Sequence, residues 1–172
     1  PARVGRRRGR RQSAGFEVSE PDSFSSLTVA ISASDRAPAF AMVRLAMRII
    51  SFNANGIRSA ADKGFFRWFA KQNADVLCLQ ETKAQEDQLT GKTFHPRGYH
   101  RVLRDATHKR GYSGVAIYSR SEPDEVRREL GFGPFDEEGR YIEARFGDLS
   151  VISLYIPSGS SSEERQQFKF EC

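Results

Sequence analysis

The 172 residues suffice for one domain with its own core, and contents of 38% hydrophobic and 11% aromatic residues exclude general disorder. The net charge is +5, but residues 1–46 hold eight Arg and four acids, whereas the remainder holds 19 Lys or Arg and 18 acids. The body of the chain is therefore nearly neutral, which excludes a uniformly basic DNA-binding surface. Apolar runs fall well short of the roughly 20 residues of a transmembrane helix, so no membrane association is expected. Cys78 and Cys172 have no metal-ligand spacing, which favours a reduced, intracellular protein.

Residues 1–46 are predicted to be a disordered extension. They carry an Arg-rich run at residues 6–11 and then become rich in Ser, Ala and Pro without sustained periodicity. The early acids Glu17 and Glu20 argue against an organelle transit segment, so targeting is not expected. Met47 stands directly before the first clear strand, and we hypothesise that the native start lies there. The predicted domain therefore covers residues 47–172.

A strand, helix, strand unit is predicted next. The apolar run 48–52 predicts a short buried strand, and 53–56 predicts a loop in which Gly56 takes a positive φ. Aromatic residues on one side and basic residues on the other predict an amphipathic helix over 61–72. The near-continuous apolar run 75–80 predicts a strand that is covered on both faces.

The second part of the chain is richer in strands. Strands are predicted over 114–118, 141–146 and 151–156, and the last two are predicted to form an antiparallel hairpin around the Gly-Asp turn at 147–148. Ser161 and Glu164 have capping-box spacing, which predicts a helix from about residue 162. The pattern as a whole indicates an α/β fold.

Three polar residues lie at the carboxyl ends of apolar strands: Asn53 after the first, Glu81 after the second, and Tyr155 near the end of the last. Ligands of α/β sheets bind beyond the carboxyl ends of strands, so these side chains could line one cleft. One carboxylate with amide oxygens is a possible Mg²⁺ site beside a phosphate. Spacing alone leaves other interpretations open. Glu81 could be a surface residue paired with Lys83, Asn53 and Asn55 could be turn formers, and Tyr155 could be a strand aromatic at a rim.

Four segments occur together in order, namely 51–58 (SFNANGIR), 75–83 (DVLCLQETK), 111–116 (GYSGVA) and 155–159 (YIPSG). They resemble successive signature blocks of exonuclease III and its apurinic/apyrimidinic endonuclease relatives, within the endonuclease/exonuclease/phosphatase superfamily. The resemblance extends from Met47 to about Phe170. Four ordered blocks are far more specific than a single motif.

The resemblance implies a metal-dependent hydrolysis of DNA phosphodiester bonds, as exonuclease III or as an abasic-site endonuclease in base excision repair. It implies Mg²⁺ or Mn²⁺ as the cofactor, abasic or 3′-blocked double-stranded DNA as the partner, and a monomeric, cytoplasmic protein associated with DNA. The implied roles are metal binding by Asn53 and Glu81, catalysis at the scissile phosphate by Tyr155, and DNA contact by Arg58, Lys63 and Tyr112. Asn55 falls where some relatives have an Asp, which weakens a ligand role for it.

The resemblance also implies the first half of a two-sheet α/β sandwich flanked by helices. In relatives the attacking water is deprotonated with the help of a Gly-Asp-x-Asn block and a Ser-Asp-His block, and neither occurs in these 172 residues. We therefore expect the chain as given to be truncated and inactive, with apolar surface exposed where the other half would pack. The alternative is a non-catalytic DNA-binding fragment that attaches through its Arg-rich N-terminal tail.

Overall fold

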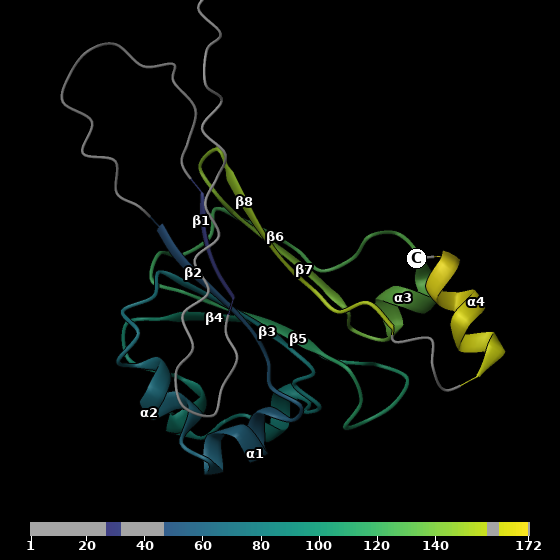
Figure 1. Cartoon of the computed structure of the whole chain (residues 1–172), viewed down its shortest axis with the longest axis horizontal. Helices are drawn as coiled ribbons and strands as arrows, with labels where there is room; N and C mark the ends of the chain where they lie inside the picture. The colour runs from purple at the N-terminus through teal and green to yellow at the C-terminus, as the bar shows by residue number, and fades with distance from the viewer. Residues whose placement is uncertain (1–26, 32–46, 158–161, 172) are drawn as a thin grey trace, which may run out of the picture.

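The computed structural model describes residues 27–31, 47–157 and 162–171, which form two sheets with short helices around them (Figure 1). The first sheet has the strand order β1-β2-β3-β5-β4 and the second β6-β7-β8. The strands are β1 (Leu27–Ile31), β2 (Met47–Asn53), β3 (Val76–Gln80), β4 (His100–Arg104), β5 (Val115–Ser119), β6 (Glu125–Arg127), β7 (Tyr141–Phe146) and β8 (Leu149–Leu154). The helices are α1 (Ile57–Asp62), α2 (Phe65–Phe69), α3 (Gly133–Glu137) and α4 (Glu163–Glu171), with 3₁₀ turns η1 (Glu86–Gln88) and η2 (Lys92–Phe94). The predicted two-sheet α/β architecture is confirmed.

The parallel pair β2 and β3 is the frame on which the site is built. Asn53 at the end of β2 lies opposite Gln80 at the end of β3, so both strands finish at the same edge of the sheet. The strand, helix, strand order predicted for this region is confirmed. The next residue after β3 is Glu81, which therefore emerges beside Asn53.

The helical connection differs from the single helix predicted over 61–72. It consists of α1 and α2, separated at Gly64, whose φ of 89° is left-handed. That backbone conformation ends a helix and is accessible to glycine at little cost. The spacing of the aromatic residues is helical on both sides of Gly64, so it did not indicate that the helix is interrupted there. The predicted bounds are therefore wrong, because α1 begins earlier and α2 ends earlier.

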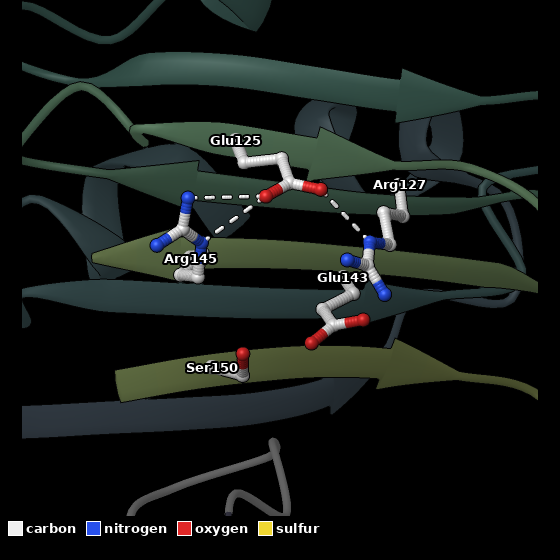
Figure 2. Close-up of a pocket in the computed structure, with 5 residues that line it drawn as sticks. All are labelled: Glu125, Arg127, Glu143, Arg145 and Ser150. Carbon is white, nitrogen blue, oxygen red and sulfur yellow. Dashed lines mark hydrogen bonds and ion pairs between the residues drawn. The ribbon is translucent and has the colours of Figure 1, made fainter. Parts of the chain in front are cut away.

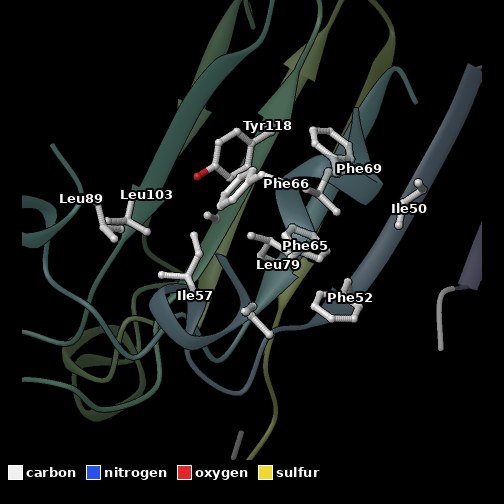
Figure 3. Packing of buried hydrophobic residues seen from close by; sticks show 14 of the residues in the cluster. Ile50, Phe52, Ile57, Phe65, Phe66, Phe69, Leu79, Leu89, Leu103 and Tyr118 are labelled. Carbon is white, nitrogen blue, oxygen red and sulfur yellow. The ribbon is translucent and has the colours of Figure 1, made fainter. Parts of the chain in front are cut away.

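An aromatic layer joins these helices to one face of the first sheet (Figure 3). Phe65 of α2 stacks on Phe52 of β2 with 4.6 Å between ring centroids, and Phe66 meets Tyr118 of β5 edge to face at 5.9 Å. Offset and edge-to-face contacts of this kind add about 0.5–1.5 kcal/mol each to the stabilisation from burial. The packing holds α1 and α2 rigidly on the sheet, and with them the loop between β2 and α1.

The other face of the first sheet packs against the second sheet. Ile49, Cys78 and Ile117 from the first sheet share a core with Ile142 and Val151 from the second. The predicted hairpin of the last two strands is confirmed by the antiparallel pairing of β7 with β8. β6, β7 and β8 cover the inner face of the first sheet, so the expected exposed apolar surface does not lie on that face.

Exposed apolar surface occurs instead on the outward side of β8. Ile152 is 50% exposed, and Leu154 and Ile156 continue the same outward row because side chains alternate between the two faces of a strand. The predicted helix near residue 162 is confirmed as α4, whose first turn is capped by a hydrogen bond of 3.2 Å from the Arg165 amide to Ser162 Oγ. Ser161 of the predicted capping box lies outside the described residues.

Part of the predicted disordered extension is ordered. Leu27–Ile31 form β1, which pairs antiparallel with β2, so the prediction is wrong for this segment. The free edge of β2 offers unpaired backbone groups, and a Leu-Thr-Val-Ala-Ile segment suits a strand. The other residues of 1–46, including the Arg-rich run, lie outside the described residues. Within the described ranges, no helix has both the length and the apolarity that crossing a membrane requires.

Besides β1, two further strands escaped prediction, β4 and β6. His100–Arg104 and Glu125–Arg127 both carry charged residues at their ends, which masks the alternation expected of a strand. Each is an edge strand of its sheet, where one side of the backbone faces away from the ladder and polar side chains are tolerated.

Candidate active site

Three loops meet at the carboxyl edge of β2 and β3, and backbone hydrogen bonds lock them together. The amide of Gly56 donates to the carbonyl of Glu81 at 2.7 Å, which joins the loop after β2 to the loop after β3. The amide of Lys83 donates to the carbonyl of Ser113 at 2.8 Å, which joins the loop after β3 to the loop before β5. The segments that resemble three separate signature blocks therefore form one hydrogen-bonded unit.

Gly114 shows how tightly this unit is closed. Its φ is 84°, and a Cβ atom at this position would stand 2.2 Å from Oγ1 of Thr82, a residue that is itself fully buried. A side chain at residue 114 would therefore have to displace Thr82 as well as adopt a disfavoured backbone conformation.

The same loops concentrate unusual backbone conformations. The described residues include five non-glycine residues with positive φ: Asn55 (43°), Asn73 (48°), Glu81 (53°), Lys83 (49°) and Ser113 (44°). Four of the five, all except Asn73, lie in the three joined loops. Positive φ in a residue such as Glu costs on the order of 1 kcal/mol and persists only where the surrounding structure imposes it. Such residues cluster at functional sites, which points to these loops.

The carboxylate of Glu81 is the centre of a polar cluster. Asn53 Nδ2 donates to Oε1 at 2.7 Å, and Lys83 Nζ forms an ion pair with Oε2 at 2.8 Å. The hydroxyl of Tyr155, just beyond the end of β8, is close enough to this carboxylate to lower its pKa. The structure therefore brings together the three residues whose convergence the sequence predicts, Asn53, Glu81 and Tyr155.

The local alternatives are present as well. Glu81 and Lys83 do form the ion pair that a surface interpretation expects, and the amide of Asn55 donates to Asn53 Oδ1 at 3.0 Å, a turn-forming hydrogen bond. In addition, Lys83 Nζ donates to Asn55 Oδ1 at 2.6 Å. These contacts order the cluster, and they place an ammonium ion against two of its oxygen atoms.

The electrostatics of the cluster favour an ionised Glu81 beside a neutral Tyr155. Burial by itself raises the pKa of Glu81, but hydrogen bonds from Asn53, Lys83 and Tyr155 and the charge of Lys83 outweigh burial and lower the pKa. For Tyr155 burial and the neighbouring carboxylate together raise the pKa, while Arg140 opposes them. At neutral pH the cluster therefore contains a carboxylate and a hydroxyl that keeps its proton.

The donor set suits a hard divalent cation. Mg²⁺ prefers oxygen ligands, keeps several waters and is commonly held by one or two carboxylates beside a phosphate. Here the oxygens are those of the Glu81 carboxylate and the side-chain amides of Asn53 and Asn55. Residues 27–31, 47–157 and 162–171 contain no group of three or more His, Cys, Asp or Glu that could hold a metal by themselves. The ammonium of Lys83 already lies between Glu81 and Asn55, so this group of oxygens accommodates a positive charge.

The residues expected to contact DNA occupy two places. Arg58 and Lys63 are exposed on and just after α1, and neither forms a hydrogen bond or ion pair with the Glu81 cluster. Tyr112 lies in the loop before β5, half-buried, with Lys109 Nζ 5.2 Å from its ring centroid. Its hydroxyl accepts hydrogen bonds from Arg140 at 3.0 Å and Arg165 at 3.2 Å.

Arg140 is the residue that sequence reasoning missed. It precedes β7, is 2% exposed, and its guanidinium lies 4.6 Å from the ring centroid of Tyr155. The one signal in the sequence is an Arg directly before a buried strand, which is too common to single out a residue.

A pocket of about 170 Å³ lies elsewhere, on the second sheet (Figure 2). Its lining is Glu125, Arg127, Glu143, Arg145 and Ser150. Glu125 pairs with Arg127 at 2.9 Å and with Arg145 at 3.1 Å. Because its charges largely satisfy one another, this pocket is a weaker candidate than the loop cluster.

Comparison with known proteins supports the same region. The profile of the Endonuclease/Exonuclease/phosphatase family matches residues 50–171. The chain is 36% identical over 126 residues to an exodeoxyribonuclease of Bacillus subtilis, which covers 73% of this chain and 48% of that protein. It is 36% identical over 124 residues to the DNA repair nuclease APEX1 of Danio rerio, covering 72% of this chain and 40% of the relative.

Solved structures agree. An AP endonuclease from Archaeoglobus fulgidus superimposes with a TM-score of 0.63 at 35% identity, over 73% of this chain and 47% of that one. The 3′ phosphatase NExo from Neisseria, solved with a product DNA hairpin, gives a TM-score of 0.64 at 30% identity, over 73% of this chain and 48% of its own. The chain thus spans about half the length of the relatives it matches. From residue 50 to residue 171 it belongs to the endonuclease/exonuclease/phosphatase family, and the relatives it resembles are exodeoxyribonucleases and AP endonucleases.

Proposed function

We propose that this chain carries the metal- and phosphate-binding part of a hydrolase that cleaves phosphodiester bonds of DNA, in the repair of abasic sites or blocked 3′ ends. The observation that carries the proposal is the contact of Asn53, Lys83 and Tyr155 with the Glu81 carboxylate, on loops held at positive φ. The names of the relatives support the reaction class, since they are an exodeoxyribonuclease, a DNA repair nuclease and an AP endonuclease.

In this proposal Glu81 and Asn53 would hold Mg²⁺ or Mn²⁺. A metal bound there would supply neutralisation of the negative charge on the phosphoryl oxygens. Tyr155 acts as a hydrogen-bond donor to a phosphoryl oxygen, and its raised pKa keeps the proton on its hydroxyl at neutral pH. Asn55, a neutral residue, orders Lys83 and supplies at most an additional amide oxygen.

Arg58, Lys63 and Tyr112 are proposed to position double-stranded DNA. The two cations are exposed on and just after α1, and Tyr112 lies half-buried in the loop before β5, so the three residues come from two separate segments. Phosphate contacts of this kind set the register of a duplex without reading its sequence. That property suits a protein that acts at lesions as a monomer.

Hydrolysis also needs a base for the attacking water, and the 172 residues contain neither a Gly-Asp-x-Asn nor a Ser-Asp-His block. Loss of a general base lowers rates by about 10² to 10⁴. We therefore propose that the polypeptide as given binds its ligands and does not cleave them. The part of the chain that binds them is proposed to lie within residues 47–172, with β1 added at the edge of its first sheet.

The test uses the purified 172-residue chain and a duplex with one tetrahydrofuran abasic-site analogue. Isothermal titration should detect Mg²⁺ binding that Glu81→Gln abolishes and Glu129→Gln, a change at an exposed carboxylate in a surface ion pair, leaves intact. Absence of Mg²⁺ binding by the unmodified chain would contradict the metal site. Mg²⁺-dependent incision of the duplex would instead overturn the proposed lack of cleavage.

The second candidate is a non-catalytic DNA-binding fragment, which the concentration of eight Arg in residues 1–46 favours. Binding through this segment would be independent of sequence and steeply dependent on salt. Deleting the whole segment would also remove β1, so the better variant replaces the five Arg of residues 6–11 by Gln. Loss of DNA binding in that variant supports the tail, and its retention supports the loops.

A further inference from the structure

Arg140 lies at the centre of a buried hydrogen-bond network behind the candidate site. Its Nε donates to Glu138 Oε2 at 2.5 Å, its Nη1 donates to the carbonyl of Tyr155 at 3.0 Å, and its Nη2 donates to the hydroxyl of Tyr112 at 3.0 Å. The backbone adds a fourth link, because the amide of Tyr155 donates to the carbonyl of Arg140 at 2.9 Å. One side chain thus reaches both tyrosines that the proposed function places at the DNA.

The guanidinium also faces both aromatic rings. Its central carbon lies 4.6 Å from the centroid of Tyr155 and 5.6 Å from that of Tyr112. A cation within about 6 Å of an aromatic face is attracted to it, and the attraction grows when water is excluded. At 2% exposure Arg140 is excluded from water. It holds Tyr112 through its ring and its hydroxyl, and Tyr155 through its ring and its backbone carbonyl.

Charge balance explains how an Arg can remain buried there. Glu138, also buried, accepts from Arg140 and from Arg165 of α4, whose Nη1 lies 2.6 Å from Oε1. Burial raises the pKa of Glu138, but the hydrogen bonds and charges of Arg165 and Arg140 outweigh it and lower the pKa. A lysine could not substitute, because a single ammonium cannot stack on a ring and donate in three fixed, diverging directions.

We propose that Arg140 is a positioning residue that couples Tyr112 to Tyr155, so that the DNA contact of one and the phosphate contact of the other form as a unit. The inference rests on the proposed function for the roles of the two tyrosines. Arg140 itself touches neither the carboxylate of Glu81 nor Lys83 through any hydrogen bond or ion pair in the described part of the chain, and acts through the tyrosines alone. Arg165 reinforces the unit from α4 by a second hydrogen bond to the Tyr112 hydroxyl.

The coupling can be read without any catalysis, by ¹⁹F NMR of the 172-residue chain labelled with fluorotyrosine. The chain has five Tyr, so five resonances can be assigned by single Tyr→Phe changes. The matched control is Arg120→Lys, since Arg120 lies 5.0 Å from the ring centroid of Tyr99 and donates to a backbone carbonyl at 3.0 Å, away from the Glu81 cluster.

Arg140→Lys should shift the resonances of Tyr112 and Tyr155 and leave that of Tyr99 unchanged, whereas Arg120→Lys should do the reverse. Tyr112→Phe keeps its ring and removes only the hydroxyl, so it provides the test if Arg140→Lys does not fold. It should shift the resonance of Tyr155 through Arg140. An unchanged Tyr155 resonance in Tyr112→Phe, or equal shifts of all resonances in Arg140→Lys, would overturn the proposal in favour of a purely structural ion pair.

A second arm measures affinity for the abasic-analogue duplex in Mg²⁺. Residues coupled through a shared partner depart from additivity, here by roughly fivefold in the dissociation constant. The change in the dissociation constant for the double variant Tyr112→Phe/Tyr155→Phe should therefore differ by that factor from the product of the changes for the two single variants. When Arg140 is also replaced by Lys, the change for the double variant should equal that product. Multiplicative effects with Arg140 present would contradict the coupling. If the chain binds no such duplex the proposed function fails, while the ¹⁹F result still decides whether Arg140 couples the two rings.

Discussion

The substitution of Glu138 is expected to have the largest effect on stability, because its single carboxylate compensates the positive charges of two arginines. Its side chain is 9% exposed and accepts from Arg140 at 2.5 Å and from Arg165 at 2.6 and 3.0 Å. Removing one partner of a buried ion pair costs about 3–5 kcal/mol, since the remaining charge stays buried without compensation. Glu138→Gln keeps the volume and one acceptor oxygen, so the low end applies, about 3 kcal/mol in the free energy of unfolding.

The assay is urea unfolding at neutral pH, with Glu129→Gln as the matched control. Glu129 is 67% exposed and lies 3.4 Å from Arg104, so its loss should change the free energy of unfolding by less than about 1 kcal/mol. If Glu138→Gln and Glu129→Gln were equally stable at neutral pH, the compensation assigned to Glu138 would be refuted.

The pH dependence of the same difference has a definite sign. The pKa of Glu138 is lowered in the folded state from its ordinary value of 4.5. A lowered folded-state pKa contributes stability that is fully present above the ordinary value and is lost as the pH falls through the folded value. The gap between the unmodified chain and Glu138→Gln should therefore be constant from neutral pH to about pH 5 and close progressively below it. A gap that widened in acid would contradict the ionised carboxylate.

Three further outcomes are expected. Lys83→Met removes the ammonium that competes with a metal ion for the oxygens of Glu81 and Asn55. The variant should therefore bind Mg²⁺ several-fold more tightly, as measured by isothermal titration. Weaker binding would show that the ammonium does not compete. Gly114→Ala should lower the free energy of unfolding by at least about 2 kcal/mol, since the added methyl group clashes with Thr82 and the backbone is also strained. Gly131→Ala is the control: it strains the backbone but has open space around it, so it should lower the free energy of unfolding by about 1 kcal/mol. Equal effects of the two substitutions would argue against the clash. Burial raises the pKa of the Cys78 thiol to about 12. In a Cys172→Ser variant, Cys78 should therefore react with a disulfide reagent at pH 8 only after the protein unfolds. Rapid reaction of Cys78 in the folded protein would contradict its burial.

The elements that the sequence predicts well are those decided by local composition. The run 75–80 is apolar at nearly every position and became β3, buried on both faces as expected. The strand 48–52 became β2, and Gly56 has the positive φ predicted for its loop. The helix over 61–72 was wrong in its bounds because helical periodicity does not register a single left-handed residue such as Gly64.

The candidate site was predictable in part for a related reason. Parallel strands end at a common edge, so Asn53 and Glu81 had to emerge side by side once β2 and β3 paired in register. The convergence of Tyr155 with them was predicted from its place near the end of its strand, but Tyr155 follows a strand of the second sheet, so its distance to Glu81 depends on how the two sheets pack. The roles assigned to these residues stay predictions.

What the sequence by itself determined was the family, the paired strands and the polar residues at their ends, since each depends on residue types at short separation. The tertiary structure alone decided that Glu81 and Lys83 adopt positive φ, that β6, β7 and β8 cover the first sheet, and that Arg140 lies buried between Tyr112 and Tyr155. These features arise from contacts between segments far apart in the chain. No local pattern records such contacts, because the energy that holds each residue in place comes from partners that only folding supplies.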